Sequence, residues 1–581
     1  MPGPIGINVG GTRVVRPGIY PRIDASAMVP MSGAPYGNAG VIGPADGGAP
    51  GTVYQFASFT EALAVLRGGP ALSHLARIFR PSPDLPGASL VRFVRIGAPT
   101  RSSLTLNGLV YTSLDYGRHT QGISALVAVG ANTPWDVTIR KRSDNYVKTY
   151  SVGNAVEVKS TATTPKVVFD HAAKQVKMYE NAAVVATLDY PTEGCTLVNL
   201  VAFLNSRTGW VAQVKAGGDP SMPICFMDNP VLGSAPAVLT TFTSLPASQG
   251  MLIWLLRDRD PHLTADLSVA GTYATLVTSD ETYLTSGTGT GNDTFVTSDW
   301  TGALAKLESE DVQCIFACTS DSAVQAACHQ HCIELRGITR KRWRRFYTGG
   351  GANQTVDQAI AAVPGFDGPT IYVWNGTTGR NPVTGLQENL GGLGSAAQLC
   401  GMRCGSAPCI SLTNKPLVAE GLEVPKPSDS DVNRMLTAGV TPIGIDPALG
   451  RTVCIQAITA YQGGTNVTYR KEQGLTVNDS LLTGFQVVLA DFVGKPMDKI
   501  TGRLLHGRIA KFLDSVTRTG SNPDGYLTPG QQNGQEIPAW TGLRVEGDGL
   551  ETWSVFVEAH PVGETAYIPV LCYLTPAPIS L

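Results

Sequence analysis

The alternation of apolar and polar positions separates this chain into two kinds of segment. Between residues 104 and 245, short runs such as 135–140 alternate between apolar and polar residues, and turn-forming residues separate the runs. A period of two predicts the strands of an antiparallel β-domain. On either side, stretches with helical spacing such as 321–335 follow short apolar runs such as 90–96 and 312–318. The pattern predicts an α/β (α+β) multi-domain protein, with an antiparallel β-domain inserted into a mixed α/β core.

The two ends of the chain are apolar extended segments with no evident strand to pair with. Residues 14–21 follow a leader rich in Gly and Pro, and residues 566–574 come close to the end of the sequence. An isolated strand leaves its backbone donors and acceptors unpaired. We therefore expect both ends to act as arms that add strands to the sheets of neighbouring subunits. The residues expected to make this exchange are Val14, Val15, Ile19, Tyr20, Tyr567, Ile568, Val570, Leu571 and Tyr573.

With 581 residues the chain is too long for a single core, and several domains are expected. The patterns divide it into an N-terminal arm (1–24), a first part of the core (25–103), an inserted outer antiparallel β-domain (104–245), an α/β core (246–460), a C-terminal α/β domain (461–560) and a C-terminal arm (561–581).

Charge and hydropathy narrow the classes of partner. The formal net charge is −2, which offers no electrostatic argument for nucleic acid or an anionic membrane surface. The longest apolar run, residues 251–256, is far shorter than a membrane span, and the first residues lack the pattern of a secretory signal. We expect a soluble protein made in the cytosol.

Candidate catalytic motifs are weak. The Gly-rich run 286–292 lacks the lysine of a phosphate-binding loop, since none occurs before Lys306, and we interpret it as a turn. Residues 392–395 lack the second glycine of a nucleophile elbow, and the eight histidines are dispersed. The sequence predicts no enzyme activity and no cofactor.

The eleven cysteines raise the question of metal binding. The run 328–332 reads Cys-His-Gln-His-Cys, but on a helix the two cysteines share one face while the histidines point elsewhere. A closed zinc site would need further ligands, for which Cys400, Cys404 and Cys409 are the candidates. Cys314 and Cys318 fall on one face of a strand, as buried thiols do. We therefore expect buried thiols in this region and no metal site.

A compact basic cluster surrounds Trp343. Its members are Arg340, Lys341, Arg342, Arg344 and Arg345. Nucleic-acid binding would call for a second basic stripe, which the sequence lacks. We expect the cluster to lie at the end of the preceding helix and to contact acidic groups of a neighbouring subunit.

Six blocks in a fixed order carry a family resemblance. They are Arg-Pro-Gly-Ile-Tyr at 16–20, the strand 91–96, the spaced residues from Leu284 to Val312, the stretch from Ala396 to Leu417, the pair of segments 438–440 and 457–459, and Tyr567-Ile568. Together they resemble the tail sheath proteins of contractile-tailed bacteriophages (myophage type) and of related contractile injection systems. The cysteines depart from this pattern, because the family more often carries small or polar residues at positions such as Cys404 and Cys409.

The resemblance implies a structural protein that works without a nucleotide. Such subunits form a homo-oligomer of hexameric rings stacked around a tail tube protein, between baseplate and tail terminator proteins. The arms exchange strands between subunits, and the sheath contracts to drive the tube through the host envelope. The inserted β-domain would lie on the outside. The implied location is the virion, after synthesis and assembly in the host cytoplasm, with no direct nucleic-acid contact and no membrane insertion.

A particle that leaves the reducing cytosol can oxidise thiols that face each other across subunit contacts. We expect Cys572 to be the first candidate for an inter-subunit disulfide, because it lies in the exchanged strand. Cys195, Cys225, Cys404 and Cys409 follow as thiols expected on surfaces or loops.

Three other classes remain open at this point: the sheath of a phage-derived injection device, a static tube protein, and a cytosolic α/β enzyme that depends on a metal or nucleotide. Electron microscopy would separate them, since a sheath forms long striated tubes.

Overall fold

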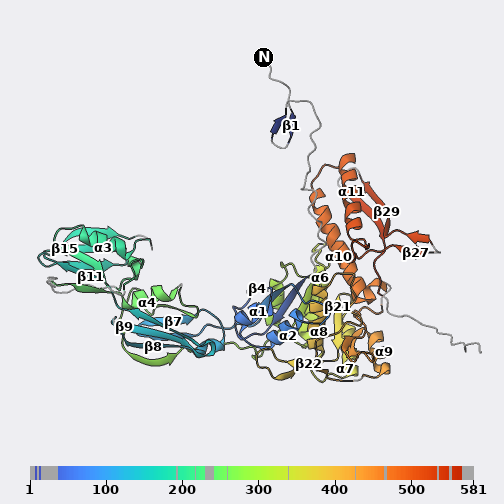
Figure 1. Ribbon diagram of the computed structural model, residues 1–581, viewed down its shortest axis with the longest axis horizontal. Coiled ribbons are helices and arrows are strands. Elements are labelled where there is room, and N and C mark those ends of the chain that lie inside the picture. The colour runs from blue at the N-terminus through green and yellow to red at the C-terminus, as the bar shows by residue number, and fades with distance from the viewer. Residues whose placement is uncertain are drawn as a thin grey trace, which may run out of the picture.

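The computed structural model describes residues 7–9, 12–14, 37–131, 133–190, 194–215, 218–228, 241–257, 259–337, 339–425, 427–463, 467–532, 535–548 and 553–564. In the N-terminal arm, β1 (Ile7–Val9) and β2 (Thr12–Val14) form a short antiparallel hairpin. The remaining strand-exchange residues and one cysteine lie outside the described residues: Val15, Ile19, Tyr20, Tyr567, Ile568, Val570, Leu571, Cys572 and Tyr573. Figure 1 shows an elongated molecule in which two β-rich lobes, a central α/β core and a helical C-terminal part follow one another.

An eight-stranded sheet forms the centre of the core, in the order β26-β25-β21-β20-β19-β3-β5-β4. Its strands are β3 (Asn38–Gly43), β4 (Val53–Phe56), β5 (Leu90–Arg95), β19 (Cys314–Ala317), β20 (Arg345–Gly349), β21 (Thr370–Trp374), β25 (Val440–Ile445) and β26 (Thr452–Cys454). The inner strands are parallel, and the two edge strands β4 and β26 are antiparallel to their neighbours. The inner strands read as continuous apolar runs because both faces of the sheet are covered.

Helices cover both faces of this sheet. They are α1 (Phe59–Leu66), α2 (Pro70–Phe79), α5 (Thr297–Lys306), α6 (Ser322–Leu335), α7 (Val356–Ala362), α8 (Gly391–Gly405) and α9 (Asp429–Ala438). Strand β19 shows the two faces: Cys314 and Phe316 pack with α2 and α8, whereas Ile315 and Ala317 pack with α5 and α6. The expected shared face of Cys314 and Cys318 is thereby confirmed.

Helix α8 lies deep in the core, and all but its last residue are buried. Gly401 brings it close to α2, because a Cβ at this position would lie 2.2 Å from the carbonyl oxygen of Ile78. A small three-stranded sheet covers its N-terminal end, formed by β22 (Thr377–Arg380), β23 (Gln387–Asn389) and β24 (Gly421–Leu422).

The inserted region contains four antiparallel sheets around one continuous apolar core. Its elements are β6 (Ser103–Leu106), β7 (Leu109–Ser113), β8 (Ile123–Val129), β9 (Trp135–Lys141), β10 (Tyr146–Val152), β11 (Asn154–Ser160), β12 (Lys166–Asp170), β13 (Gln175–Glu180), β14 (Ala183–Asp189), α3 (Leu197–Asn205), β15 (Trp210–Val214), β16 (Thr243–Pro246), α4 (Ser248–Arg257), β17 (Leu263–Leu267) and β18 (Ser279–Tyr283). Because β17 pairs with β7 and β18 with β8, the insertion continues well past the boundary expected at residue 245.

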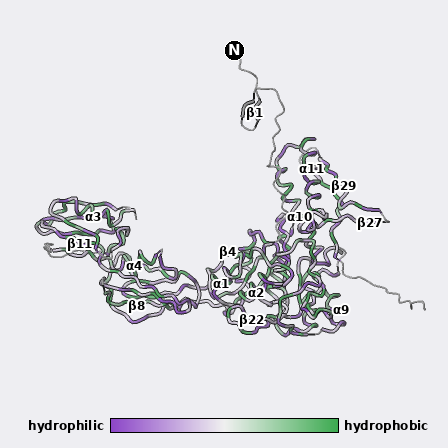
Figure 2. Tube along the Cα trace, viewed as in Figure 1, coloured by the Kyte–Doolittle hydropathy of each residue, from purple (hydrophilic) through white to green (hydrophobic). Residues whose placement is uncertain are grey.

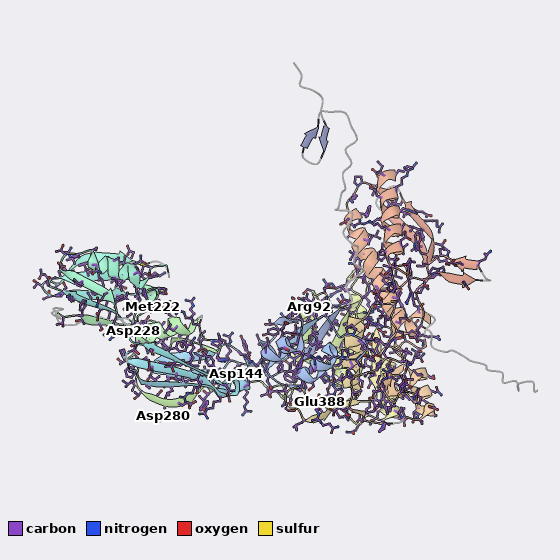
Figure 3. The ribbon with its side chains drawn as sticks, in the orientation of Figure 1. Arg92, Asp144, Met222, Asp228, Asp280 and Glu388 are labelled. Carbon is purple, nitrogen blue, oxygen red and sulfur yellow. The ribbon has the colours of Figure 1, made fainter. Side chains whose placement is uncertain are left out.

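Asp228 connects the two lobes of the insertion. Its carboxylate accepts hydrogen bonds from the backbone nitrogens of Ser248 at 2.7 Å and Gly250 at 2.9 Å, at the start of α4. Burial raises the pKa of the Asp228 carboxyl to about 6. Figure 3 shows Asp228 and the buried Met222 at the junction between the lobes.

Arg95 fastens the insertion to the core. Its guanidinium is buried and donates to four backbone oxygens: those of Gly48 at 2.6 Å, Asp46 at 3.1 Å, Tyr116 at 3.2 Å and Gly289 at 3.4 Å. These carbonyls belong to a core loop, to the loop after β7 in the insertion and to the connection that returns from the insertion to the core. A single side chain thus holds three separate chain segments together.

The C-terminal part combines two long helices with two β-hairpins. Its elements are α10 (Glu472–Leu489), α11 (Lys499–Ser515), β27 (Gly530–Gln532), β28 (Gln535–Ile537), β29 (Trp540–Gly547) and β30 (Trp553–Ala559). Ile509 and Phe512 of α11 pack in an apolar cluster with the inner face of the β29–β30 hairpin. Hydrophilic and hydrophobic residues are interspersed along the chain in Figure 2, and none of the described helices is long and apolar enough to cross a membrane.

Candidate assembly interface

The β29–β30 hairpin is an incomplete sheet. Within the part of the chain that the structure describes, its two strands pair only with each other, so both outer edges are open. One face rests on α11, while the other carries Phe556, which is 46% exposed and lies under the guanidinium of Arg544. Open edges can accept further strands, and a two-stranded sheet gains stability by doing so. This hairpin is therefore a candidate acceptor for exchanged arms.

The C-terminal arm starts from an anchored position. Glu564, the last described residue, accepts hydrogen bonds from Lys471 Nζ at 2.5 Å, Ser411 Oγ at 2.5 Å and Thr413 Oγ1 at 3.1 Å. Burial opposes ionisation, but these three donors outweigh it and hold the pKa of the Glu564 carboxyl below its usual value. The expected arm at 561–581 therefore begins with residues fixed to the C-terminal domain.

The first residue of β3 is tied to the loop before β19. The Asn38 side-chain amide donates to the backbone oxygen of Asp311 at 3.1 Å and to its carboxylate at 3.3 Å. Strand β3 therefore starts from a fixed point at one end of the central sheet.

The basic cluster divides into an exposed and a buried part. Arg340, Lys341 and Arg342 are exposed, and the side chain of Arg340 pairs with Glu308. Arg344 and Arg345 are only 1% and 2% exposed. The expectation that all five cations form a charged surface is therefore wrong for these two.

The reason is that Arg344 and Arg345 lie where β20 enters the central sheet. The Arg344 guanidinium donates to the backbone oxygens of Leu307 at 2.9 Å and Glu310 at 2.6 Å, and to His331 Nε2 at 3.0 Å. It thereby satisfies carbonyls at the end of α5. The expected position at the end of the preceding helix is also wrong, because α6 ends at Leu335.

A cleft of about 360 Å³ lies between the exposed basic residues and α10. Its lining includes Glu310, Asp311, Lys341 and Arg342, so that both signs of charge face it, together with Val487 of α10, which is 61% exposed. Mixed charge next to exposed apolar surface is suited to a protein contact.

The structure separates the candidate disulfide cysteines into two groups. Cys195 and Cys225 are half-buried in the insertion. Cys404 is 1% exposed and lies within α8, so the expectation of a surface or loop thiol is wrong for it. Cys409 lies in the turn after α8, as a loop thiol, but is only 6% exposed. Cys404 belongs to α8, which is enclosed by the central sheet, α2 and the C-terminal domain.

The imagined zinc ligand set does not assemble. Cys328 and Cys332 pack on the α5–α6 face of the sheet, whereas Cys400 and Cys404 pack on the opposite face. Instead, the structure brings Cys314 of β19 next to Cys400 and Cys404. The sequence indicated part of this cluster, because Cys400 and Cys404 are four residues apart and so lie on one face of a helix.

Comparison with known proteins shows what the chain resembles. No family model matches the chain. The tail sheath protein of Bacillus phage SP01 is 26% identical over 510 residues, which cover 84% of this chain and 86% of that protein. Among solved structures, the sheath tail protein of Desulfitobacterium hafniense superposes with a TM-score of 0.56 at 14% identity, covering 94% of this chain and 97% of that one. The sheath tail protein of Listeria innocua gives 0.50 at 13% identity, covering 93% and 98%.

The fold is therefore that of these two sheath tail proteins, a mixed multi-domain α/β architecture. The expected resemblance to the tail sheath proteins of bacteriophages is confirmed, and the similarity extends over most of the chain.

Proposed function

We propose that the chain polymerises as hexameric rings stacked around a tail tube, and that contraction of this sheath drives the tube through the host envelope. The observation that carries the proposal is the β29–β30 hairpin with two open edges. An N-terminal arm from one neighbour fills one edge, and a C-terminal arm from another fills the second. Each hairpin then becomes a four-stranded sheet built from three subunits.

The anchored base at Glu564 makes the C-terminal arm a hinge. The ion pair with Lys471 keeps the start of the arm on its own subunit while the exchanged strand stays in the neighbour's sheet. Subunits can then shift as rigid bodies without loss of the exchanged main-chain hydrogen bonds. Additional surface buried in the contracted lattice supplies the driving free energy, and neither catalysis nor a cofactor is required.

The insertion points away from the C-terminal part in Figure 1. This arrangement supports a position on the outside of the sheath, with the strand-exchange region closer to the tube. The partners in this proposal are further copies of the chain, a tail tube protein, and baseplate and terminator proteins at the ends, all within the virion after assembly in the host cytoplasm.

Deletion of the terminal strand tests the proposal. A chain lacking residues 566–581 is expected to fold but not to form tubes under negative-stain electron microscopy. A matched control lacks only residues 576–581 and so retains the strand 566–574. The control should polymerise like the full chain. Normal tubes from the longer deletion, with an unchanged circular dichroism spectrum, would refute strand exchange by this arm.

We further propose that Arg340, Lys341 and Arg342 contact acidic groups of an adjacent subunit through the cleft beside α10. Their exposure and the mixed charge of the cleft support this role. Raising the ionic strength should weaken tube formation less in a variant with all three residues changed to Gln than in the unchanged chain. Equal salt dependence of the two would contradict the contact.

Disulfides between subunits remain part of the proposal for Cys572, Cys195 and Cys225. The half-buried positions of Cys195 and Cys225 are compatible with such pairing, whereas those of Cys404 and Cys409 are not. Non-reducing gel electrophoresis of assembled tubes should show covalent oligomers. If only monomer is seen without reductant, the disulfide proposal fails while strand exchange stands.

A further inference from the structure

Three buried thiols converge between the central sheet and α8. The Sγ atoms of Cys314, Cys400 and Cys404 all lie within 4.8 Å of one another, and none of the three residues is more than 1% exposed. Cys314 is the first residue of β19, and its side chain points to the face that α8 covers. Cys400 and Cys404 come from successive turns of α8, so that both face the strand. The helix and the strand thus supply a preformed set of three sulfur ligands.

A group of arginines and carboxylates lies beside this thiol cluster and reaches it through Arg345. Arg403 forms a bidentate pair with Glu472, with both nitrogen–oxygen distances at 2.8 Å. Arg336 forms a second pair with Asp479, at 2.9 and 2.6 Å. Each carboxylate is therefore already matched to one guanidinium.

Arg345 is the third cation of this group, and it lacks a carboxylate of its own. Arg344 is also buried, but it stands apart because it donates to backbone oxygens and to His331. Its Nη1 lies 4.0 Å from Asp479, which Arg336 already occupies, and neither its Nε nor its Nη1 makes a hydrogen bond. Its Nη2 points at the sulfur of Cys314, at 3.9 Å. Three guanidinium groups and two carboxylates leave one positive charge unbalanced, and an unbalanced buried charge is strongly destabilising.

We propose that Cys314, Cys400 and Cys404 bind one thiophilic divalent metal ion of the zinc class as three thiolates. Zinc–sulfur bonds are about 2.3 Å long, and tetrahedral ligands then lie about 3.8 Å apart, which the separation of these thiols allows. Three thiolates around a divalent ion carry a net charge of −1. This charge balances the cation left over at Arg345.

The charge count also distinguishes the proposal from other states of the three sulfurs. Three neutral thiols leave Arg345 without a counter-charge. A disulfide between two of them is likewise neutral and leaves one thiol over. Copper(I) with three thiolates would carry −2, one negative charge more than the surplus cation balances. The divalent complex is the state that fits the buried charges around it.

Binding converts three thiols and one metal ion into the complex and releases three protons to solvent. The protein supplies three ligands, and a water molecule completes the four that zinc prefers. Because the site is enclosed, the ion enters during folding. The complex ties β19 to α8 and so fastens the centre of the sheet to its covering helix.

Metal content of the full chain tests the proposal directly. Protein produced in zinc-supplemented medium and dialysed without chelator should contain about one zinc per chain by mass spectrometry of the elements. X-ray absorption at the zinc edge should show three sulfur neighbours at about 2.3 Å. The absence of stoichiometric metal, or a shell made of nitrogen and oxygen alone, would overturn the proposal.

Substitutions locate the metal in the chain. Cys400→Ser and Cys404→Ser should each lower the bound zinc at least tenfold. Cys318→Ser is the matched control, because Cys318 is buried on the same face of the sheet and lies outside the cluster. Retention of zinc by Cys404→Ser would refute the site.

Two measurements on the unchanged chain keep the test decisive if the serine variants fail to fold. Cobalt(II) added during refolding should give the visible bands of a thiolate-rich site. Titration of thiols after denaturation in a chelator should recover Cys314, Cys400 and Cys404 as reduced thiols. A disulfide among them would overturn the proposal.

Discussion

Arg403 of α8 and Glu472 at the start of α10 form a bidentate ion pair in which neither side chain has any exposed surface. Glu472 also accepts a hydrogen bond from the hydroxyl of Tyr347 at 2.7 Å. The pair joins the helix at the centre of the core to the first helix of the C-terminal part. The C-terminal part, which carries the β29–β30 hairpin, is therefore coupled to the core, which contains the central eight-stranded sheet.

Arg403→Met should destabilise the chain by about 3–5 kcal/mol, because it leaves the Glu472 carboxylate buried without its partner. Urea unfolding of chains kept unassembled by deletion of residues 566–581 would measure the loss. Arg380→Met is the control, since it breaks an exposed pair with Glu420 and should cost less than about 1 kcal/mol. If both substitutions lower the free energy of unfolding equally, burial of the Arg403–Glu472 pair does not increase its contribution to stability.

Arg95→Met should loosen the joint between insertion and core, because four backbone oxygens lose a charged donor at once. We expect faster tryptic cleavage in the connection at Arg101, with both parts still folded. Arg140→Met, which removes a pair with Glu281 inside the insertion, should leave the cleavage rate unchanged. Identical digestion of all three chains would contradict the assigned role of Arg95.

His74 should make the core sensitive to mild acid. Burial, and to a smaller extent the charge of Arg77, lowers the pKa of His74 to about 3. Because the folded pKa lies below that of the unfolded chain, its contribution to stability is complete above pH 6.5 and is lost as the pH falls towards 3. Between pH 7 and pH 5 the loss from this one group amounts to about 2 kcal/mol.

His74→Leu should therefore lose less stability than the unchanged chain when the pH falls from 7 to 5. Urea unfolding at the two pH values measures the difference. Exposed His506 provides the control, because His506→Leu should keep the full pH dependence. If His74→Leu loses as much stability between pH 7 and pH 5 as the unchanged chain, a group other than His74 causes the acid sensitivity.

Lys471→Met should weaken assembly more than folding. The substitution removes the charged partner of Glu564 at the base of the C-terminal arm, so the arm starts from a looser position. Sedimentation should show a smaller polymerised fraction at the same protein concentration. Lys177→Met breaks a pair with Asp170 inside the insertion, away from the hairpin and the arm, and should change the polymerised fraction less. If the polymerised fraction of Lys471→Met equals that of the unchanged chain, the ion pair between Lys471 and Glu564 does not contribute to assembly.

Local patterns predicted much of the fold. The period-two runs of the insertion form antiparallel strands, and β19 places Cys314 and Phe316 on one face as its alternation requires. The boundary at residue 245 was wrong because α4 carries an apolar run, and such a run does not reveal which domain the helix packs against.

The buried charges and thiols depend on contacts between segments far apart in the sequence. Arg344 and Arg345 resemble a surface cluster because their partners, such as the carbonyl of Leu307 and the sulfur of Cys314, lie some thirty residues or more away. Cys314 likewise meets Cys400 only once β19 and α8 have packed together. The spacing of residues within one helix or strand does not indicate which distant segment packs against it.

The insertion leaves and re-enters the core at almost one point, since Ser103 at its start forms a β-bridge with Thr285 at its end. Strand neighbours lie about 5 Å apart, a gap that a two-residue turn can span. The whole unit can therefore be exchanged as a cassette. A shorter, longer or foreign domain could replace it while the register of the central sheet stays the same, which offers a site for displaying cargo on the particle.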